Sequence, residues 1–177
     1  MNLPNILSIS RILLLIPIIF LFENGLYFFS LITYIAASLT DYFDGYIARK
    51  KNLSTKLGAI LDLVADKLFV SILLIWATYS FESFLIFLSA LIIISRELTI
   101  SYLRMYLLQS GYPQDSLSPD FIGKFKTTFQ MIGLGFLIVS PLNNILALSA
   151  IYIIFLSSVF SLFSLLSYLI KWIGDPK

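Results

Sequence analysis

Apolar residues along this chain occur in long runs that are separated by short polar or turn-forming stretches. The runs cover residues 5–22, 26–48, 57–80, 83–108, 120–140 and 145–170. Each has about the 17–25 residues that an α-helix needs to cross the hydrocarbon core of a bilayer. The pattern therefore predicts an all-α integral membrane protein with six transmembrane helices, in which residues 1–177 form a single domain.

Composition supports a membrane setting. Hydrophobic residues make up 59% of the chain and charged residues 12%, and soluble proteins have about 45–50% apolar residues. Because these few ionic groups cannot cover the surface of a soluble fold of this size, the excess apolar surface is expected to face lipid. The formal charge of +2 is too small to indicate a nucleic-acid partner. Without cysteine or histidine, carboxylates are the leading candidates for acid-base chemistry.

The connections between the runs alternate in charge. Those at 23–25, 80–82 and 141–144 contain no Lys or Arg. With Arg11 and Arg96 assigned to the other side, all twelve basic residues lie in one half of the membrane. Because basic residues favour the cytoplasmic side, both termini of this multi-pass protein are predicted to be cytoplasmic.

Four aspartates form the most informative pattern. Asp41 and Asp44 are spaced i, i+3 and Asp62 and Asp66 i, i+4, so each pair shares one face of a helix. The short connection makes the two helices antiparallel neighbours, so the four carboxylates can converge. An ionised Asp at membrane depth costs about 2.5 kcal/mol or more, and a cation must compensate. Several oxygen ligands suit Mg²⁺ or Mn²⁺, so we predict two divalent ions that bind a diphosphate.

Nearby small and basic residues fit the same site. Gly45 and Gly58 allow close approach of a ligand or backbone, and Arg49 lies one turn beyond Gly45, where it can contact phosphate. Two alternatives stay open at this point. The carboxylates could pair with local Lys and Arg at the membrane edge, and the glycines could serve helix packing.

The same residues match the signature DxxDGxxAR…GxxxDxxxD, and the chain thereby resembles the CDP-alcohol phosphotransferase family. The resemblance implies six helices around a polar cavity open to the cytoplasmic side, and a homodimer. It implies displacement of CMP from a CDP-activated lipid by an alcohol, with two divalent metals. Asp66 would be the general base as well as a metal ligand. The CDP-diacylglycerol site would include Asn5, Ser8, Gly45, Ala48, Arg49 and Gly58.

Residues 95–100 and 123–130 resemble the subgroup of the family whose acceptor is sn-glycerol 3-phosphate. An acceptor with its own phosphate needs further cations, and four residues are candidates for this pocket: Arg96, Arg104, Lys124 and Lys126. Glu97 is expected to orient Arg96. The alternative is that Arg104, Lys124 and Lys126 are ordinary anchors at the cytoplasmic side.

Two other functions remain alternatives. The first is the same fold with another acceptor, such as phosphatidylglycerol or inositol phosphate. The second is a membrane transporter subunit in which the buried aspartates form an ion path, which requires acidic residues spread through the bilayer. The aspartates instead cluster toward one face of the membrane. Glu23 and Glu82 lie in the connections on the opposite side. This clustering favours the enzyme.

Overall fold

The computed structural model describes residues 3–51, 56–112 and 121–173, with side chains described at 6, 8–40, 58, 61–112 and 125–170. The described backbone is helical apart from short turns, which confirms the predicted all-α class. The six helices each begin and end within a few residues of the predicted runs. They are α1 (Leu3–Glu23), α2 (Tyr27–Lys51), α3 (Lys56–Phe81), α4 (Phe84–Gln109), α5 (Phe121–Val139) and α6 (Asn144–Ile173), with a 3-10 turn, η2 (Ser140–Leu142), before α6.

A tight turn makes α1 and α2 antiparallel. Between α1 and α2, Gly25 has φ of 75°, a conformation that glycine adopts without steric cost. The amide of Gly25 donates to the carbonyl of Phe22 at 2.9 Å, and that of Leu26 donates to the carbonyl of Leu21 at 2.9 Å. These two bonds satisfy carbonyls left open by the end of α1 and return the chain along it.

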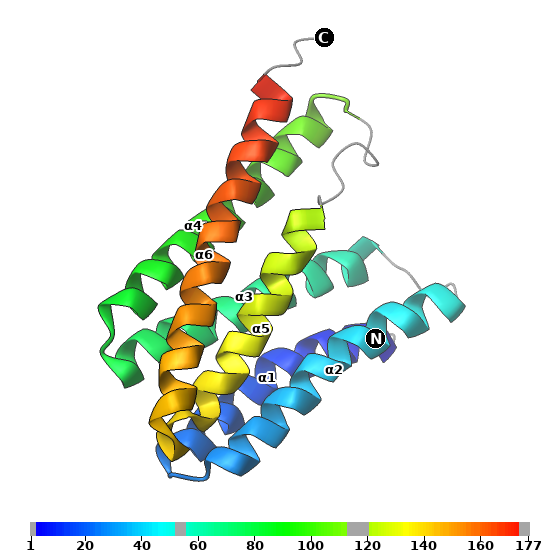
Figure 1. The fold of residues 1–177 in the computed structure, drawn as a ribbon. Coiled ribbons are helices and arrows are strands. Elements are labelled where there is room, and N and C mark those ends of the chain that lie inside the picture. Colours follow the sequence, from blue (N-terminus) through cyan, green and yellow to red (C-terminus); the bar gives the residue numbers. More distant parts are fainter. Residues whose placement is uncertain (1–2, 52–55, 113–120, 174–177) are drawn as a thin grey trace.

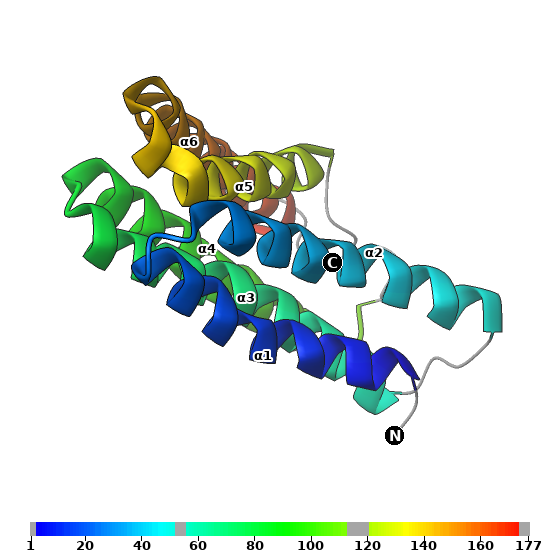
Figure 2. The same cartoon turned by 90° about the horizontal axis from the view of Figure 1, so that it is seen from below.

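The helices pack in a ring whose order differs from the sequence (Figure 1). Around the ring the order is α1, α2, α5, α6, α4 and α3, and α3 returns to α1. Among the described contacts, α2 and α3, which were predicted to be neighbours, are therefore separated by α1, because both pack against it. Contacts between α3 and α5 cross the ring. Viewed from below, α1 and α3 lie side by side, and α2 lies between them and α5 (Figure 2). This order brings α3, α4 and α5 together around one internal region.

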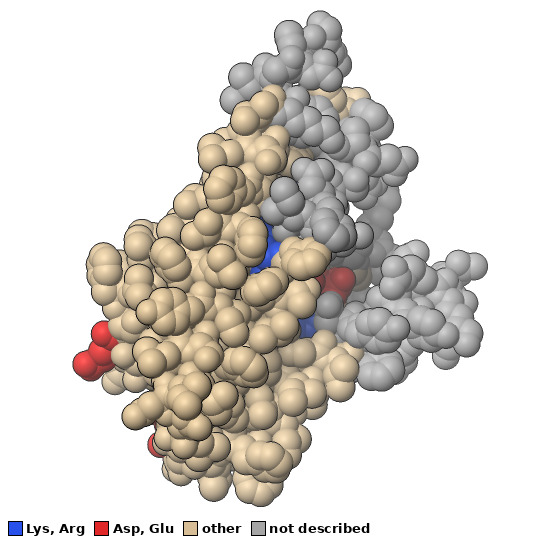
Figure 3. Space-filling model, viewed as in Figure 1, with Lys and Arg blue, Asp and Glu red and all other residues tan. Residues whose placement is uncertain are grey.

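Much of the outer surface is apolar. Within the described residues, three helical segments are long and apolar enough to cross a membrane: Phe84–Gln109, Phe125–Leu142 and Asn144–Ile170. On the face drawn in Figure 3 the described surface is mainly uncharged, and blue atoms of Lys or Arg are visible in a recess near the centre of the view. Exposed apolar surface of this extent is typical of contact with lipid. The membrane crossing of the other three helices stays a prediction.

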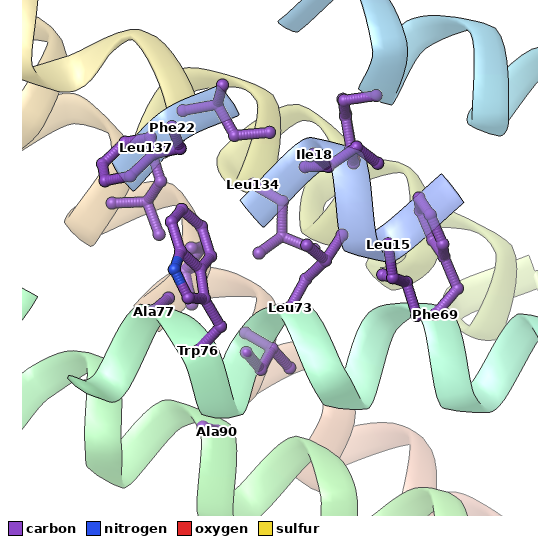
Figure 4. Packing of buried hydrophobic residues seen from close by; sticks show 14 of the residues in the cluster. Leu15, Ile18, Phe22, Phe69, Leu73, Trp76, Ala77, Ala90, Leu134 and Leu137 are labelled. Carbon is purple, nitrogen blue, oxygen red and sulfur yellow. The ribbon is translucent and has the colours of Figure 1, made fainter. Parts of the chain in front are cut away.

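The core is built from the inward faces of all six helices, and Figure 4 labels residues of α1, α3, α4 and α5 within it. On α1, Leu15, Ile18 and Phe22 are buried at spacings of three and four residues, which places them on one face. Going back along the same face, the next buried residue is Arg11. The inward stripe of α1 therefore changes from apolar to charged along its length, and the charged part borders a pocket.

Candidate functional site

A pocket of about 500 Å³ lies where the inward faces become polar, between α1, α2, α3, α4 and α5. Charged side chains, hydroxyl groups and apolar side chains together line it. The residues that line it are Arg11, Ser38, Leu63, Asp66, Lys67, Phe69, Val70, Ser71, Ile93, Arg96, Glu97, Ile100, Arg104, Lys126, Thr127, Thr128, Gln130 and Met131. A concave site of this size with convergent polar groups suits a small polar ligand.

Positive charge predominates in this wall. Its described residues include five cationic side chains, Arg11, Lys67, Arg96, Arg104 and Lys126, but two carboxylates, Asp66 and Glu97. Since low-dielectric walls focus the field of such an excess, the pocket attracts anions. The charges of the described side chains therefore favour a phosphate-bearing ligand.

Two buried cations of the pocket share one carboxylate. Arg96 on α4, 7% exposed, donates from Nη1 to Oε1 of Glu97 at 2.8 Å and from Nη2 to the hydroxyl of Ser164 on α6 at 2.7 Å. The buried Lys126 on α5 donates from Nζ to the same oxygen of Glu97. One carboxylate thus serves two buried cations and links α4 to α5. This cluster holds both cations at the pocket while leaving one positive charge uncompensated within it.

Arg104 extends the cationic wall two turns further along α4. Its guanidinium carbon lies 5.7 Å from the centroid of the Tyr168 ring on α6, within the range of a cation-π contact. Its Nε is buried and has no hydrogen-bond partner among the described residues. Arg96 and Arg104, predicted to share a pocket, are therefore brought together.

Two of the four predicted metal ligands, Asp62 and Asp66, are described, and both face Arg11. Nη1 of Arg11 pairs with Oδ1 of Asp66, and Nη2 lies 3.8 Å from Oδ1 of Asp62. The side chains of Asp62 and Asp66 are 43% and 48% exposed, whereas that of Arg11 is 2% exposed. The two carboxylates are consequently paired with a buried cation while remaining partly exposed.

Several predicted site residues lie outside the described side chains: Asn5, Asp41, Asp44, Gly45, Ala48, Arg49 and Lys124. Their backbone belongs to α1, α2 or α5. Of the remaining nucleotide-site candidates, Ser8 is buried and Gly58 is half-buried. No group of three or more His, Cys, Asp or Glu side chains that could hold a metal is present among the residues described.

The donor chemistry nevertheless fits a divalent cation. Asp62 and Asp66 present carboxylate oxygens one helical turn apart on α3, at a half-open position. Hard cations such as Mg²⁺ take carboxylate oxygens and keep open positions for a ligand. This pair can supply part of an oxygen-ligated metal site.

Comparison with known proteins identifies the family. The model of the CDP-alcohol phosphatidyltransferase family matches residues 1–166. The chain belongs to this family. This membership confirms the resemblance inferred from the aspartate signature.

Two bacterial members of the CDP-alcohol phosphatidyltransferase family show the similarity across the whole chain. A protein of Salmonella choleraesuis (strain SC-B67) is 36% identical over 177 residues, which cover 98% of this chain and 96% of the relative. One of Escherichia coli (strain K12) is 36% identical over 171 residues, which cover 95% and 93%. Both relatives are named CDP-diacylglycerol–glycerol-3-phosphate 3-phosphatidyltransferase.

Three pocket residues of this family member were missed by the sequence-based site. Arg11 was assigned to topology, although a charge within an apolar run, three residues after Ser8, signals a buried polar face. Lys67 donates to the hydroxyl of Ser101 on α4. Gln130, 3% exposed, lies one turn beyond Lys126, and its Nε2 has no partner among the described residues. A lone amide within an apolar run is the signal that could have found it.

Proposed function

We propose that this protein transfers the phosphatidyl group of CDP-diacylglycerol to sn-glycerol 3-phosphate, giving phosphatidylglycerophosphate and CMP in phospholipid biosynthesis. The observation that carries the proposal is that Asp66 and the buried cations Arg96 and Lys126 line one pocket. A carboxylate beside an excess of cations suits deprotonation of a hydroxyl on a phosphorylated acceptor. The names of the two relatives support the same reaction.

The membrane setting is part of this proposal. We take all six helices to span the bacterial inner membrane as one domain, with both termini and the pocket opening on the cytoplasmic side. The apolar surface and the three helices long enough to cross a bilayer support this arrangement. A homodimer is proposed from the family resemblance.

The donor is assigned to the α1, α2 and α3 side of the pocket. Asp41, Asp44, Asp62 and Asp66 would hold two divalent cations, Mg²⁺ or Mn²⁺, which when bound would neutralise the charge of the diphosphate. The carboxylates of Asp62 and Asp66, which remain partly exposed, support this role. Around the cytidine nucleotide we assign Asn5, Ser8, Gly45, Ala48, Arg49 and Gly58.

The acceptor is assigned to the α4 and α5 side. Arg96, Arg104, Lys124 and Lys126 would bind its phosphate, because charge-assisted hydrogen bonds from Arg and Lys are the strong contacts to phosphate oxygens. Glu97 fixes Arg96 and Lys126 in place through its shared oxygen. The acceptor would thereby present a hydroxyl group toward Asp66.

Asp66 then acts as the general base. It accepts the proton of the acceptor hydroxyl, whose oxygen forms a bond to the phosphorus of the phosphatidyl group. The bond from that phosphorus to the oxygen of CMP breaks, and CMP leaves with the electron pair. Removal of a general base lowers the rate by about 10²- to 10⁴-fold.

The test uses purified protein with labelled CDP-diacylglycerol and a panel of acceptors. We expect CMP release with sn-glycerol 3-phosphate, abolition of release by EDTA, and its loss in Asp66→Asn with donor binding retained. Glu23→Gln is the matched carboxylate-to-amide control, because Glu23 contacts Trp76 and Ser80 away from the pocket. Indifference to glycerol 3-phosphate would refute the acceptor, and near-normal turnover by Asp66→Asn would remove Asp66 from the base role.

A further inference from the structure

We propose that Arg11 is a positioning residue that orients the carboxylate of Asp66 at the pocket through a hydrogen bond to one of its oxygens. This inference rests on the proposed function, in which Asp66 is the base. Arg11 acts through Asp66 and is not proposed to contact substrate.

Burial is the first support for this role. The side chain of Arg11 is 2% exposed, and the same face of α1 continues with the buried Leu15 and Ile18. A guanidinium in such surroundings is strongly unfavourable unless it is paired and hydrogen-bonded. Arg11 is therefore held in place by its ion pairs. A shift of Arg11 would also shift the carboxylates with which it pairs.

The second support is the unequal geometry of the two ion pairs. Arg11 donates a hydrogen bond from Nη1 to Asp66, whereas its Nη2 is 3.8 Å from Asp62, beyond hydrogen-bonding distance. The planar, branched guanidinium fixes direction as well as charge. Arg11 therefore constrains Asp66 more tightly than Asp62, although the two carboxylates are one turn apart on the same helix.

The third support is that the neighbouring cations are engaged elsewhere. Lys67, next to Asp66 in the chain, donates to Ser101 on α4. Arg96 donates to Glu97 and Ser164. These bonds hold both cations toward α4, and among the described side chains Arg11 is the cation that pairs with Asp66.

A matched control exists because α1 contacts α3 by polar groups at both ends. Arg11 meets Asp66 at the pocket, and Glu23 accepts hydrogen bonds from Trp76 at 2.9 Å and Ser80 at 3.0 Å at the other end. Glu23→Gln weakens the link between the same two helices without touching the pocket. A purely structural contribution of Arg11 should therefore resemble the effect of Glu23→Gln.

The experiment compares wild type, Arg11→Gln, Arg11→Lys and Glu23→Gln. We expect Arg11→Gln to lower kcat by about 100-fold, since small misplacement of a catalytic group has this effect, while KM for both substrates stays within about twofold. Arg11→Lys should recover part of kcat, because lysine keeps the positive charge but lacks the planar, branched guanidinium that fixes the direction of the hydrogen bonds. Glu23→Gln should keep the wild-type kcat.

Mn²⁺ binding without substrates, followed by electron paramagnetic resonance, provides a readout besides activity. Removing a cation next to two carboxylates should leave the Mn²⁺ dissociation constant of Arg11→Gln equal or lower. Wild-type kcat in Arg11→Gln, or weaker Mn²⁺ binding in step with lost activity, would overturn the positioning role. If Arg11→Gln does not fold, Arg11→Lys decides, and wild-type kcat in that variant would also overturn it. Failure of the wild type itself to release CMP would instead refute the proposed function.

Discussion

The two ends of the helix bundle solve the problem of buried polar groups in opposite ways. At the end near the turn between α1 and α2, Glu23 accepts hydrogen bonds from Trp76 and Ser80 beside an apolar core. At the pocket end the described wall has five cations and two carboxylates. Along α4, the inward stripe passes from Ile86 and Ile93 to Arg96.

The polar groups at the two ends contribute differently to folding stability and to ligand binding. A polar group whose hydrogen bonds are satisfied within the protein contributes modestly to folding. A surplus of buried charge costs free energy unless a ligand of opposite charge neutralises it. The described charges of the pocket end therefore favour an anionic ligand, whereas the polar contacts of the far end are satisfied within the protein. The following four changes test this contrast.

The largest effect on stability is expected for Glu97→Gln. Loss of this carboxylate leaves Arg96 and Lys126 buried without their shared anion, and breaking such a cluster costs about 3 kcal/mol. Denaturant unfolding in detergent measures the loss. Glu23→Gln should cost about 1 kcal/mol, and equal losses for the two variants would contradict the contrast between the ends.

The second effect concerns the acceptor. Arg104→Gln removes a pocket cation that has no ion pair among the described residues. Charge-assisted hydrogen bonds contribute about 1.5–3 kcal/mol, so KM for glycerol 3-phosphate should rise about 10- to 100-fold. KM for CDP-diacylglycerol should change little, and Arg104→Lys should be milder. A parallel rise in both KM values would place Arg104 outside the acceptor pocket.

A third change probes the close packing of the apolar half. A Cβ added at Gly133 on α5 would lie 2.6 Å from Cγ1 of Ile154 on α6. Such overpacking costs about 1–3 kcal/mol, so Gly133→Ala should unfold more easily. Gly135→Ala is the control, because its Cβ would meet Tyr34 no closer than 3.4 Å. A larger loss in Gly135→Ala would contradict this packing.

The smallest effect is expected for Trp76→Phe at the far end. The change removes the hydrogen bond from Nε1 of Trp76 to Glu23 while keeping an aromatic ring against Phe22. We expect a loss of about 1 kcal/mol and wild-type turnover. A marked fall in CMP release would mean that the two ends are coupled.

The helices could be predicted from the sequence because the apolar runs are long and their breaks are sharp. The turn around Gly25, for example, falls where the first two runs separate. The order of the helices around the ring could not be predicted, since lipid-facing and core-facing residues are both apolar. In α1, Leu13 is 59% exposed and Leu15 is 4% exposed, and nothing in their side chains distinguishes them.

The site was predictable where its residues repeat at helical spacing. Asp62 and Asp66 were assigned to one face, and both contact Arg11. Arg96 and Lys126 were assigned to one pocket, and both line it. Arg11 was missed as a site residue because its partner is 55 residues away on another helix, a relation that spacing within a helix does not contain.

The shared carboxylate of Glu97 also constrains how this protein can change by mutation. Replacing Glu97 alone leaves two cations unbalanced in the interior. Replacing Arg96 or Lys126 alone leaves one cation paired with Glu97, and replacing all three with apolar residues of similar volume removes the buried charge altogether. An exchange that begins with the loss of Glu97 is therefore the least favourable route. The triple replacement would give a stable protein that no longer binds the acceptor, which makes it a useful folded, inactive form for binding studies with CDP-diacylglycerol.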